Sequence, residues 1–173
     1  VLALNNETMA QFDIEFSNKV NSKGVTNQRG SGRCWLFSGL NVLRAKMIAK
    51  YNLGAMEFSE NYCFFYDQLE KSNLFLQAVI DNGKKPMDDR TVDWLFHNPL
   101  SDGGTFCGVA DVVSKYGLVP STVMPETFSS NSTGTYSMLL KTKLREYGLT
   151  LRKMIADGKS DKQVVAKKVE MLG

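Results

Sequence analysis

The residues that most constrain the fold are the apolar side chains between Cys34 and about Lys50, which recur at spacings of three and four. Because an α-helix repeats about every 3.6 residues, this spacing places them on one face of a helix that packs on a core. The members of this stripe are Leu36, Phe37, Leu40, Leu43, Met47 and Ile48. Alternating strand patterns are few in the rest of the chain, so the sequence predicts a mostly helical structure.

Two further helices are expected before residue 120. Ser59 is typical of a helix N-cap and begins a helix that ends at Asn82 and Gly83. Its predicted buried face is Tyr62, Phe65, Tyr66, Leu69, Phe75 and Leu76. A third helix is predicted from about Thr105 to Tyr116, where Gly117 ends it. Its predicted buried side is Phe106, Val109, Ala110 and Val113. Between the two, a short apolar piece, TVDWLF, leads into the loop HNPLSDGG.

The C-terminal part begins with a surface connection, PSTVMPETFSSNSTGT, and continues with helical patterns. Leu140, Leu144, Tyr147, Leu151 and Met154 form a seam at spacings of four and three. Ser160 and Gln163 have the spacing of a capping box that begins a final helix. The seam needs a helical partner.

Composition and charge narrow the functional classes. The 173 residues contain no run near the roughly 18 to 20 apolar residues that span a bilayer, and no secretion signal at the start. Three cysteines without close spacing favour a reducing compartment, the cytosol. Residues 141–173 hold nine Lys and Arg against four Asp and Glu, so this segment is either a solvated helix face or a contact for an acidic partner or nucleic acid. Because the chain begins at Val1 rather than Met, we expect it to be part of a longer protein.

Cys34 follows a glycine-rich loop, NQRGSGR, at the predicted start of the first helix. A cysteine attacks an amide carbonyl as the thiolate, so a catalytic cysteine needs a pKa below the usual value of about 8.5. The N–H groups and positive dipole end of a helix N-terminus favour that anion and can also bind an oxyanion, for which Gln28 could supply a second donor. The alternative is that Cys34 is a small buried apolar residue, the usual fate of an unmodified cysteine.

The chain contains one histidine, His97, followed directly by Asn98. A thiolate nucleophile needs an imidazole to protonate the leaving amine and an Asn or Asp to orient that ring. We nevertheless expect His97 to be an incidental loop or helix-end residue. Cys63 and Cys107 are expected to be core thiols. A metal site made of these residues with Cys34 is disfavoured, because the four lie on separate elements without Cys-x-x-Cys spacing.

The segment QRGSGRCWLFSG resembles the active-site segment of papain-like cysteine peptidases, whose core pattern is a glutamine, five residues, a cysteine and a tryptophan. Arg33 replaces the serine that usually precedes the cysteine, and Ser31 stands where secreted members carry a disulfide cysteine. The sequence Gly-Arg-Cys-Trp resembles instead the branch of bleomycin hydrolases and bacterial aminopeptidases C. Further segments resemble that branch in the same order along nearly the whole chain: KGVTNQRGSGRCWLF, FSENYCFFYDQLEKSNLFL, NPLSDGG, KYGLVP and PETFSS.

The resemblance implies an α+β papain-like fold. This chain would be the mostly helical left lobe with the start of an inserted helical region, and the barrel lobe would be missing. The implied divisions are an N-terminal segment with the oxyanion loop at 1–33, a helical lobe at 34–135 and a helical insertion at 136–173. The leucine seam of the insertion would then pack on elements outside this chain, either on a partner chain that carries the rest or by self-association.

The resemblance also implies roles for individual residues. Cys34 is the nucleophile, Gln28 the oxyanion-hole side chain and Trp35 a packing residue beside the thiol. Asp102, Gly103 and Gly104 resemble the loop whose glycine backbone pairs with an extended peptide substrate. Without the family, a Gly-Gly pair in a loop is simply a turn.

One departure from the family pattern follows this loop. Thr105 and Phe106 stand where the family often has Gln-Trp, which concerns the shape of the neighbouring subsite and not the mechanism.

The implied activity is that of a cytoplasmic cysteine aminopeptidase, which hydrolyses peptides from the N-terminus through a thioester acyl-enzyme, without a cofactor or metal. The full-length protein is expected to be a homohexamer. The family places its catalytic His and Asn far downstream, so the remaining C-terminal half, in the same or a separate chain, is expected to supply them, and the isolated chain is predicted to be inactive. The alternative is a non-catalytic assembly or nucleic-acid-binding module that uses the basic 141–173 segment.

Overall fold

The computed structural model describes residues 5–13 and 15–173, in which the regular structure is helical. The helices are α1 Asn6–Ala10, α2 Cys34–Tyr51, α3 Glu60–Asp81, α4 Arg90–His97, α5 Phe106–Tyr116, α6 Phe128–Asn131, α7 Thr133–Ala156 and α8 Asp161–Leu172. Within these ranges the strand-like pairings are two isolated bridges, Gly30 with Ser132 and Phe58 with Pro120. The mostly helical prediction is confirmed. Positions 1–4 and 14 of the predicted 1–33 segment lie outside the described residues.

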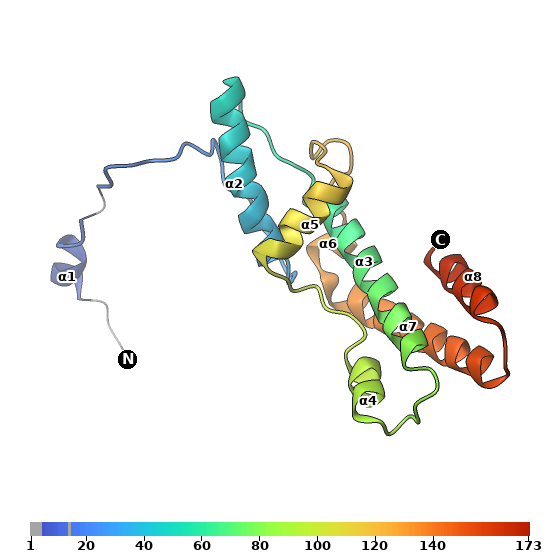
Figure 1. Cartoon of the computed structure of the whole chain (residues 1–173). Coiled ribbons are helices and arrows are strands. Elements are labelled where there is room, and N and C mark those ends of the chain that lie inside the picture. The colour runs from blue at the N-terminus through green and yellow to red at the C-terminus, as the bar shows by residue number, and fades with distance from the viewer. Residues whose placement is uncertain (1–4, 14) are drawn as a thin grey trace.

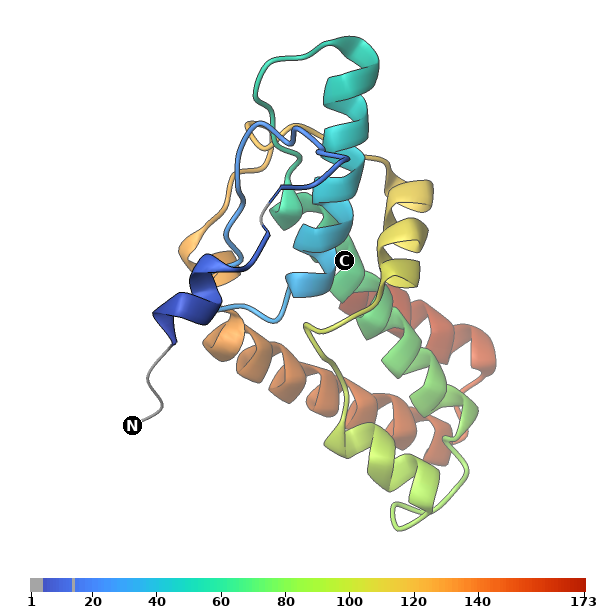
Figure 2. The same ribbon diagram turned by 90° about the vertical axis from the view of Figure 1, so that its left-hand side faces the viewer.

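Helix α3 runs through the middle of the molecule and organises the other helices (Figure 1). Helices α2 and α5 pack against its first half, and α7 and α8 pack against its second half. Helix α4 lies against its far end, and α1 stands apart from the other helices (Figure 1). Figure 2 shows the start of α7 close to the loop that leads into α2. No helix in the described part of the chain is both long and apolar enough to cross a lipid bilayer.

Local sequence signals set most of the helix ends. The Ser59 side chain accepts a hydrogen bond from the backbone N–H of Tyr62, and Ser160 forms the predicted capping box with Gln163. Gly117 ends α5 with φ of 76°, a conformation that favours glycine. Helix α4 is a finding that the sequence did not predict. Its eight residues are too few to display a repeated apolar stripe, although Asp89 caps it.

The core consists of two apolar clusters arranged along α3. The α2–α5 cluster contains Trp35, Leu36, Leu40, Phe58, Cys63, Phe64, Val109 and Val112. The α7–α8 cluster contains Phe75, Leu76, Val79, Leu95, Leu100, Leu144, Leu151 and Val164. The expectation that the leucine seam finds its partner outside this chain is wrong, because Leu144 and Leu151 are buried against α3 and α8.

Three residues of the predicted buried faces, Phe65, Phe106 and Ala110, are exposed. Phe65 of α3 is 49% exposed and Phe106 of α5 is 63% exposed. The run of aromatic residues in α3 offers two adjacent stripes, and the packing of α2 and α5 selects the one that contains Cys63 and Phe64. Phe106 is the first residue of α5, and the burial of that helix begins one turn later, at Val109.

The boundaries proposed at 33/34 and 135/136 stay predictions. Helix α2 begins at Cys34, and α7 is one continuous helix from Thr133 to Ala156.

Candidate active site

Cys34 is the first residue of α2 and is exposed. The helix begins there because the carbonyl of Arg33 accepts hydrogen bonds from the N–H groups of Leu36 and Phe37 at 3.0 Å each. No acidic side chain lies in the first turn of the helix. Cys34 therefore lies at the positive end of the helix dipole, which no acidic side chain of that turn offsets. The alternative that Cys34 is a buried core residue is wrong.

The loop before Cys34 is held by a closed set of hydrogen bonds. The Gln28 side-chain Nε2 donates to the Ser31 carbonyl at 2.7 Å, and the Ser31 hydroxyl donates to the Gln28 carbonyl at 2.6 Å. The Nε of Arg33 donates to the same Ser31 hydroxyl at 2.9 Å. An amide nitrogen carries two hydrogens, so the bond to Ser31 leaves Gln28 a second N–H donor. Gln28 thus lies in the same ordered loop as Cys34.

Arg33 is the residue whose importance the sequence did not reveal. Its side chain is fully buried, and its two terminal nitrogens donate to the two carboxylate oxygens of Glu126 at 2.9 and 2.8 Å. Its guanidinium carbon lies 5.0 Å from the ring centre of Phe37 and 5.3 Å from that of Phe64. In the sequence it stood out only as a replacement for serine, because its partner is distant along the chain.

Glu60 lies beside this ion pair, at the first position of α3, and is also buried. Burial raises the pKa of its carboxyl to about 7, with smaller contributions from the negative charges of Glu126 and Glu57. Its backbone hydrogen bond and the positive charge of Arg33 oppose the rise. A buried carboxyl that changes charge near neutral pH therefore lies next to the loop that carries Cys34.

Asp102 fixes the other side of the loop. Its carboxylate accepts hydrogen bonds from the backbone N–H of Gly32 at 2.8 Å and from the hydroxyl of Thr133 at 2.7 Å. Burial acts to raise the pKa of Asp102, but these two hydrogen bonds, together with one from its own backbone and the positive charge of Lys141, outweigh it, and the pKa lies below its usual value. The Trp35 indole N–H donates to the Asp102 carbonyl at 2.9 Å. Asp102 thereby joins the loop before α2, the tryptophan after Cys34 and the start of α7.

The glycine pair lies against the tryptophan. A Cβ added to Gly104 would lie 2.7 Å from the Trp35 ring, so this close approach requires glycine. The Gly103 carbonyl accepts from the Lys71 ammonium at 2.8 Å, and its N–H donates to the Ser101 hydroxyl at 3.1 Å. The structure thus brings Cys34, Trp35 and the 102–104 loop together around the start of α2. That Gly103 and Gly104 bind an extended peptide stays a prediction.

The other two cysteines differ from each other. Cys63 is fully buried, as expected of a core thiol, and burial, aided by the charge of Glu60, raises its pKa to about 12. Cys107 is exposed, so the prediction of a second core thiol is wrong. The reason is its position two residues before the buried Val109, which places Cys107 on the opposite side of α5 from the face that packs on α2 and α3. In the described part of the chain, no three His, Cys, Asp or Glu side chains gather in a way that could hold a metal ion.

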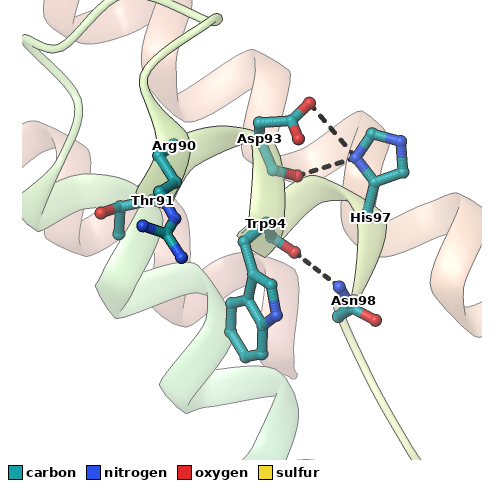
Figure 3. A pocket seen from close by; sticks show the side chains of 6 residues that line it. All are labelled: Arg90, Thr91, Asp93, Trp94, His97 and Asn98. Atoms are coloured by element: carbon teal, nitrogen blue, oxygen red, sulfur yellow. Dashed lines mark hydrogen bonds and ion pairs between the residues drawn. The ribbon is translucent and has the colours of Figure 1, made fainter.

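His97 is the last residue of α4 and is exposed, as expected of a helix-end residue (Figure 3). Its Nδ1 lies 2.9 Å from the carbonyl oxygen of Asp93 and 3.3 Å from a carboxylate oxygen of the same residue. The Asn98 amide donates to the Trp94 carbonyl at 3.0 Å and not to the imidazole. These residues line a surface hollow along α4 with Arg90 and Thr91 (Figure 3). Figures 1 and 2 both place α4 away from the start of α2.

A cysteine at a helix N-terminus, with an amide side chain in the preceding loop and a glycine pair packed on the following tryptophan, is typical of papain-like cysteine peptidases. The family described as the Peptidase C1-like family matches residues 2–173, and the chain belongs to it.

Relatives of known name support the same assignment. The chain is 42% identical to the aminopeptidase C of Lactobacillus delbrueckii subsp. lactis over 96% of this chain and 37% of that protein. It is 36% identical to the bleomycin hydrolase of Homo sapiens over 95% of this chain and 37% of that protein. A crystal structure of PepW from Lactobacillus rhamnosis HN001 superposes with a TM-score of 0.89 at 40% identity, covering 97% of this chain and 38% of that one. The chain therefore spans a little over a third of the length of these relatives.

Proposed function

We propose that this chain is the cysteine-bearing part of a cytoplasmic aminopeptidase of the bleomycin hydrolase and aminopeptidase C type. The observation that carries the proposal is that Cys34 is exposed at the first position of α2 while the loop before it is fixed on both sides. A nucleophile must be accessible and held in one geometry. The substrate is a peptide with an unmodified N-terminus, and no cofactor takes part.

In the proposed reaction, the Cys34 thiolate attacks the carbonyl carbon of the N-terminal residue. A carbon–sulfur bond forms, the carbon–nitrogen bond breaks, and the leaving amine takes a proton from an imidazolium. Water then hydrolyses the thioester and regenerates the thiol. The second N–H of Gln28 and the backbone N–H at the start of α2 stabilise the oxyanion. The left-lobe assignment, the peptide-binding role of the 102–104 loop and the packing of Trp35 beside the thiol are parts of the same proposal.

The imidazole and its Asn partner are proposed to come from sequence outside these 173 residues, in the same protein or in a separate chain. His97 is the only histidine here, and its ring is directed to Asp93 on α4. A homohexamer is part of the same proposal for the full-length protein.

Thiol alkylation tests the role of Cys34. Iodoacetamide near pH 6 should modify Cys34 well ahead of Cys107, and mass spectrometry of the resulting peptides measures both in one sample. Cys107 is the informative comparison because it is exposed too, whereas Cys63 should react slowly on account of its burial. Equal rates at Cys34 and Cys107 would contradict the proposal.

Peptide turnover tests the completeness of the site. The isolated chain should not hydrolyse an aminoacyl-coumarin substrate. In the full-length protein, Cys34→Ala should abolish hydrolysis and Gln28→Ala should lower kcat by a factor of roughly 10² to 10³. Hydrolysis by the isolated chain that Cys34→Ala removes would show that a base lies within these residues.

The nucleic-acid-binding alternative has less support from the surface. Lys153 pairs with Asp157 at 3.1 Å, Lys167 pairs with Glu170 at 2.6 Å, and Lys168 donates to the Gln77 side chain. Salt-dependent retention on DNA that is lost when Lys153, Lys159, Lys167 and Lys168 are neutralised would favour it. Failure to bind at low salt would remove it.

A further inference from the structure

Arg33 directly precedes the proposed nucleophile and is tied to a residue far along the chain. Its guanidinium and the Glu126 carboxylate form two parallel hydrogen bonds, at 2.9 and 2.8 Å, the geometry that only arginine can supply. The Arg33 side chain has no exposed surface, and the Glu126 side chain is 28% exposed. A buried ion pair costs desolvation and is weak evidence for stability, so its position calls for another explanation.

The hydrogen bonds of Arg33 continue into the loop. Its Nε–H donates to the Ser31 hydroxyl, and that hydroxyl donates to the Gln28 carbonyl at 2.6 Å. Each group along this path donates a hydrogen bond to the next, from the guanidinium to the hydroxyl and from the hydroxyl to the carbonyl. The path ends at the backbone of the residue that carries the proposed oxyanion donor. One guanidinium therefore connects Glu126 to both Gln28 and, through the backbone, Cys34.

The other end of the path is anchored in the core. A third hydrogen bond, from the Ser130 hydroxyl at 2.8 Å, holds the Glu126 carboxylate. The two residues before Glu126 are fixed to the start of α3, where Ser59 donates to the Met124 carbonyl at 2.5 Å and Asn61 donates to the Pro125 carbonyl at 2.8 Å. Glu126 is therefore a fixed point, and Arg33 links the loop to it.

We propose that Arg33 is a positioning residue, which holds the 28–34 loop against Glu126 and thereby sets the geometry of Cys34 and Gln28. This inference rests on the proposed function of Cys34. Arg33 contacts neither substrate nor reacting atoms in this role. A competing explanation is electrostatic, in which the positive charge of Arg33 alone stabilises the thiolate. The two explanations predict opposite changes in the reactivity of Cys34 for the variant Glu126→Gln.

The test measures the alkylation rate of Cys34 relative to Cys107 near pH 6 in the 173-residue chain. Arg33→Lys keeps the charge but loses the fork, and Glu126→Gln removes a negative charge and weakens the pair. If Arg33 positions the loop, both variants should lower the ratio by roughly fivefold, the factor for about one lost hydrogen bond. Ser31→Ala, which breaks the path between Arg33 and Gln28, should lower it as well.

Arg44→Lys is the matched control. Arg44 is also buried on α2, but its guanidinium contacts the Gly24 carbonyl and Glu57 rather than the 28–34 loop. The Arg44→Lys variant should have the same ratio of Cys34 to Cys107 alkylation as the original chain, even if it is less stable. Urea unfolding followed by circular dichroism measures that stability.

Two results would overturn the inference alone, with Cys34 still more reactive than Cys107 in the original chain. In the first, Arg33→Lys leaves the ratio unchanged and Glu126→Gln raises it, as a purely electrostatic role requires. In the second, Arg44→Lys lowers the ratio as much as Arg33→Lys, as general destabilisation requires. Equal reactivity of Cys34 and Cys107 in the original chain would contradict the proposed function, and the inference with it.

Discussion

The two halves of α3 are stabilised in different ways. The α2–α5 cluster is surrounded by buried charges, among them Arg33, Arg44 and Glu60. The α7–α8 cluster is formed by apolar side chains, whereas the charged residues buried in the described part of the chain lie on α2, in the loop before it or in the first half of α3. They are Arg33, Arg44, Glu60 and Asp67. Apolar packing is sufficient to hold helices together. Buried polar groups demand particular partners, and two of them here, Arg33 and Glu60, lie beside the loop that carries Cys34, where one arrangement is needed.

The largest effect should come from the ion pair of the α2–α5 half. Arg33→Met should lower the free energy of unfolding by about 3 to 5 kcal/mol, because it removes the positive charge that pairs with the Glu126 carboxylate and the donor to the Ser31 hydroxyl. Urea unfolding followed by circular dichroism measures this. Arg145→Met is the comparison in the other half. Its side chain is partly exposed and donates to the Phe96 carbonyl, so about 1 kcal/mol is expected.

Adding Glu126→Leu to Arg33→Met should recover part of the lost stability, since no unpaired charge then remains buried. A double variant as unstable as the sum of the two single variants would show that the pair is not a unit.

The next effect concerns the apolar half. Leu151→Ala should cost about 2 to 4 kcal/mol, because the fully buried side chain leaves a cavity between α3, α7 and α8. Leu139→Ala on the same helix is the control, at about 0.5 kcal/mol or less, because Leu139 is 62% exposed. The alkylation ratio of Cys34 to Cys107 should stay unchanged in both variants. A changed ratio in Leu151→Ala would mean that the two halves are coupled through α3.

A smaller and pH-dependent effect is expected at Glu60, which faces Arg33, Glu57, Glu126 and Cys63. Its pKa of about 7 in the folded chain exceeds its ordinary value of 4.5, so the folded state holds the proton more tightly. Its contribution to stability is fully present below about pH 4.5 and is lost as the pH rises through about 7.

Glu60→Gln stays neutral and should therefore be more stable than the original chain at pH 8, by roughly 1 to 3 kcal/mol. The difference should disappear near pH 5. Thermal unfolding at several pH values measures it, with the exposed Glu170→Gln in α8 as the control. A difference that does not depend on pH would contradict the raised pKa.

The smallest effect should come from surface ion pairs. Lys153 pairs with Asp157 at 3.1 Å, but the two side chains are 77% and 51% exposed. Lys153→Ala should therefore change the free energy of unfolding by less than about 0.5 kcal/mol. A larger loss of free energy in urea unfolding would mean that charge interactions stabilise the α7–α8 half as well. The contrast between the two halves would then be weaker.

The sequence predicted what depends on near neighbours along the chain. The stripe after Cys34, the caps at Ser59 and Ser160 and the end of α5 at Gly117 all involve residues within a few positions of one another. Helix periodicity and capping are local properties of the backbone, so they can be read before the fold is known. The motif around Cys34 and Gln28 was found for the same reason, because its residues lie within one short segment of the chain.

Tertiary structure decided which surfaces and partners these elements meet. Phe64 rather than Phe65 is buried because α2 and α5 approach that side of α3, and Cys107 is exposed because it lies on the side of α5 opposite Val109. Leu151 is buried because α8 folds back on α7. The partner of Arg33 is Glu126, distant in sequence, and no local pattern indicates that pairing. Burial and ion pairing depend on distances between segments that only the folded chain brings together.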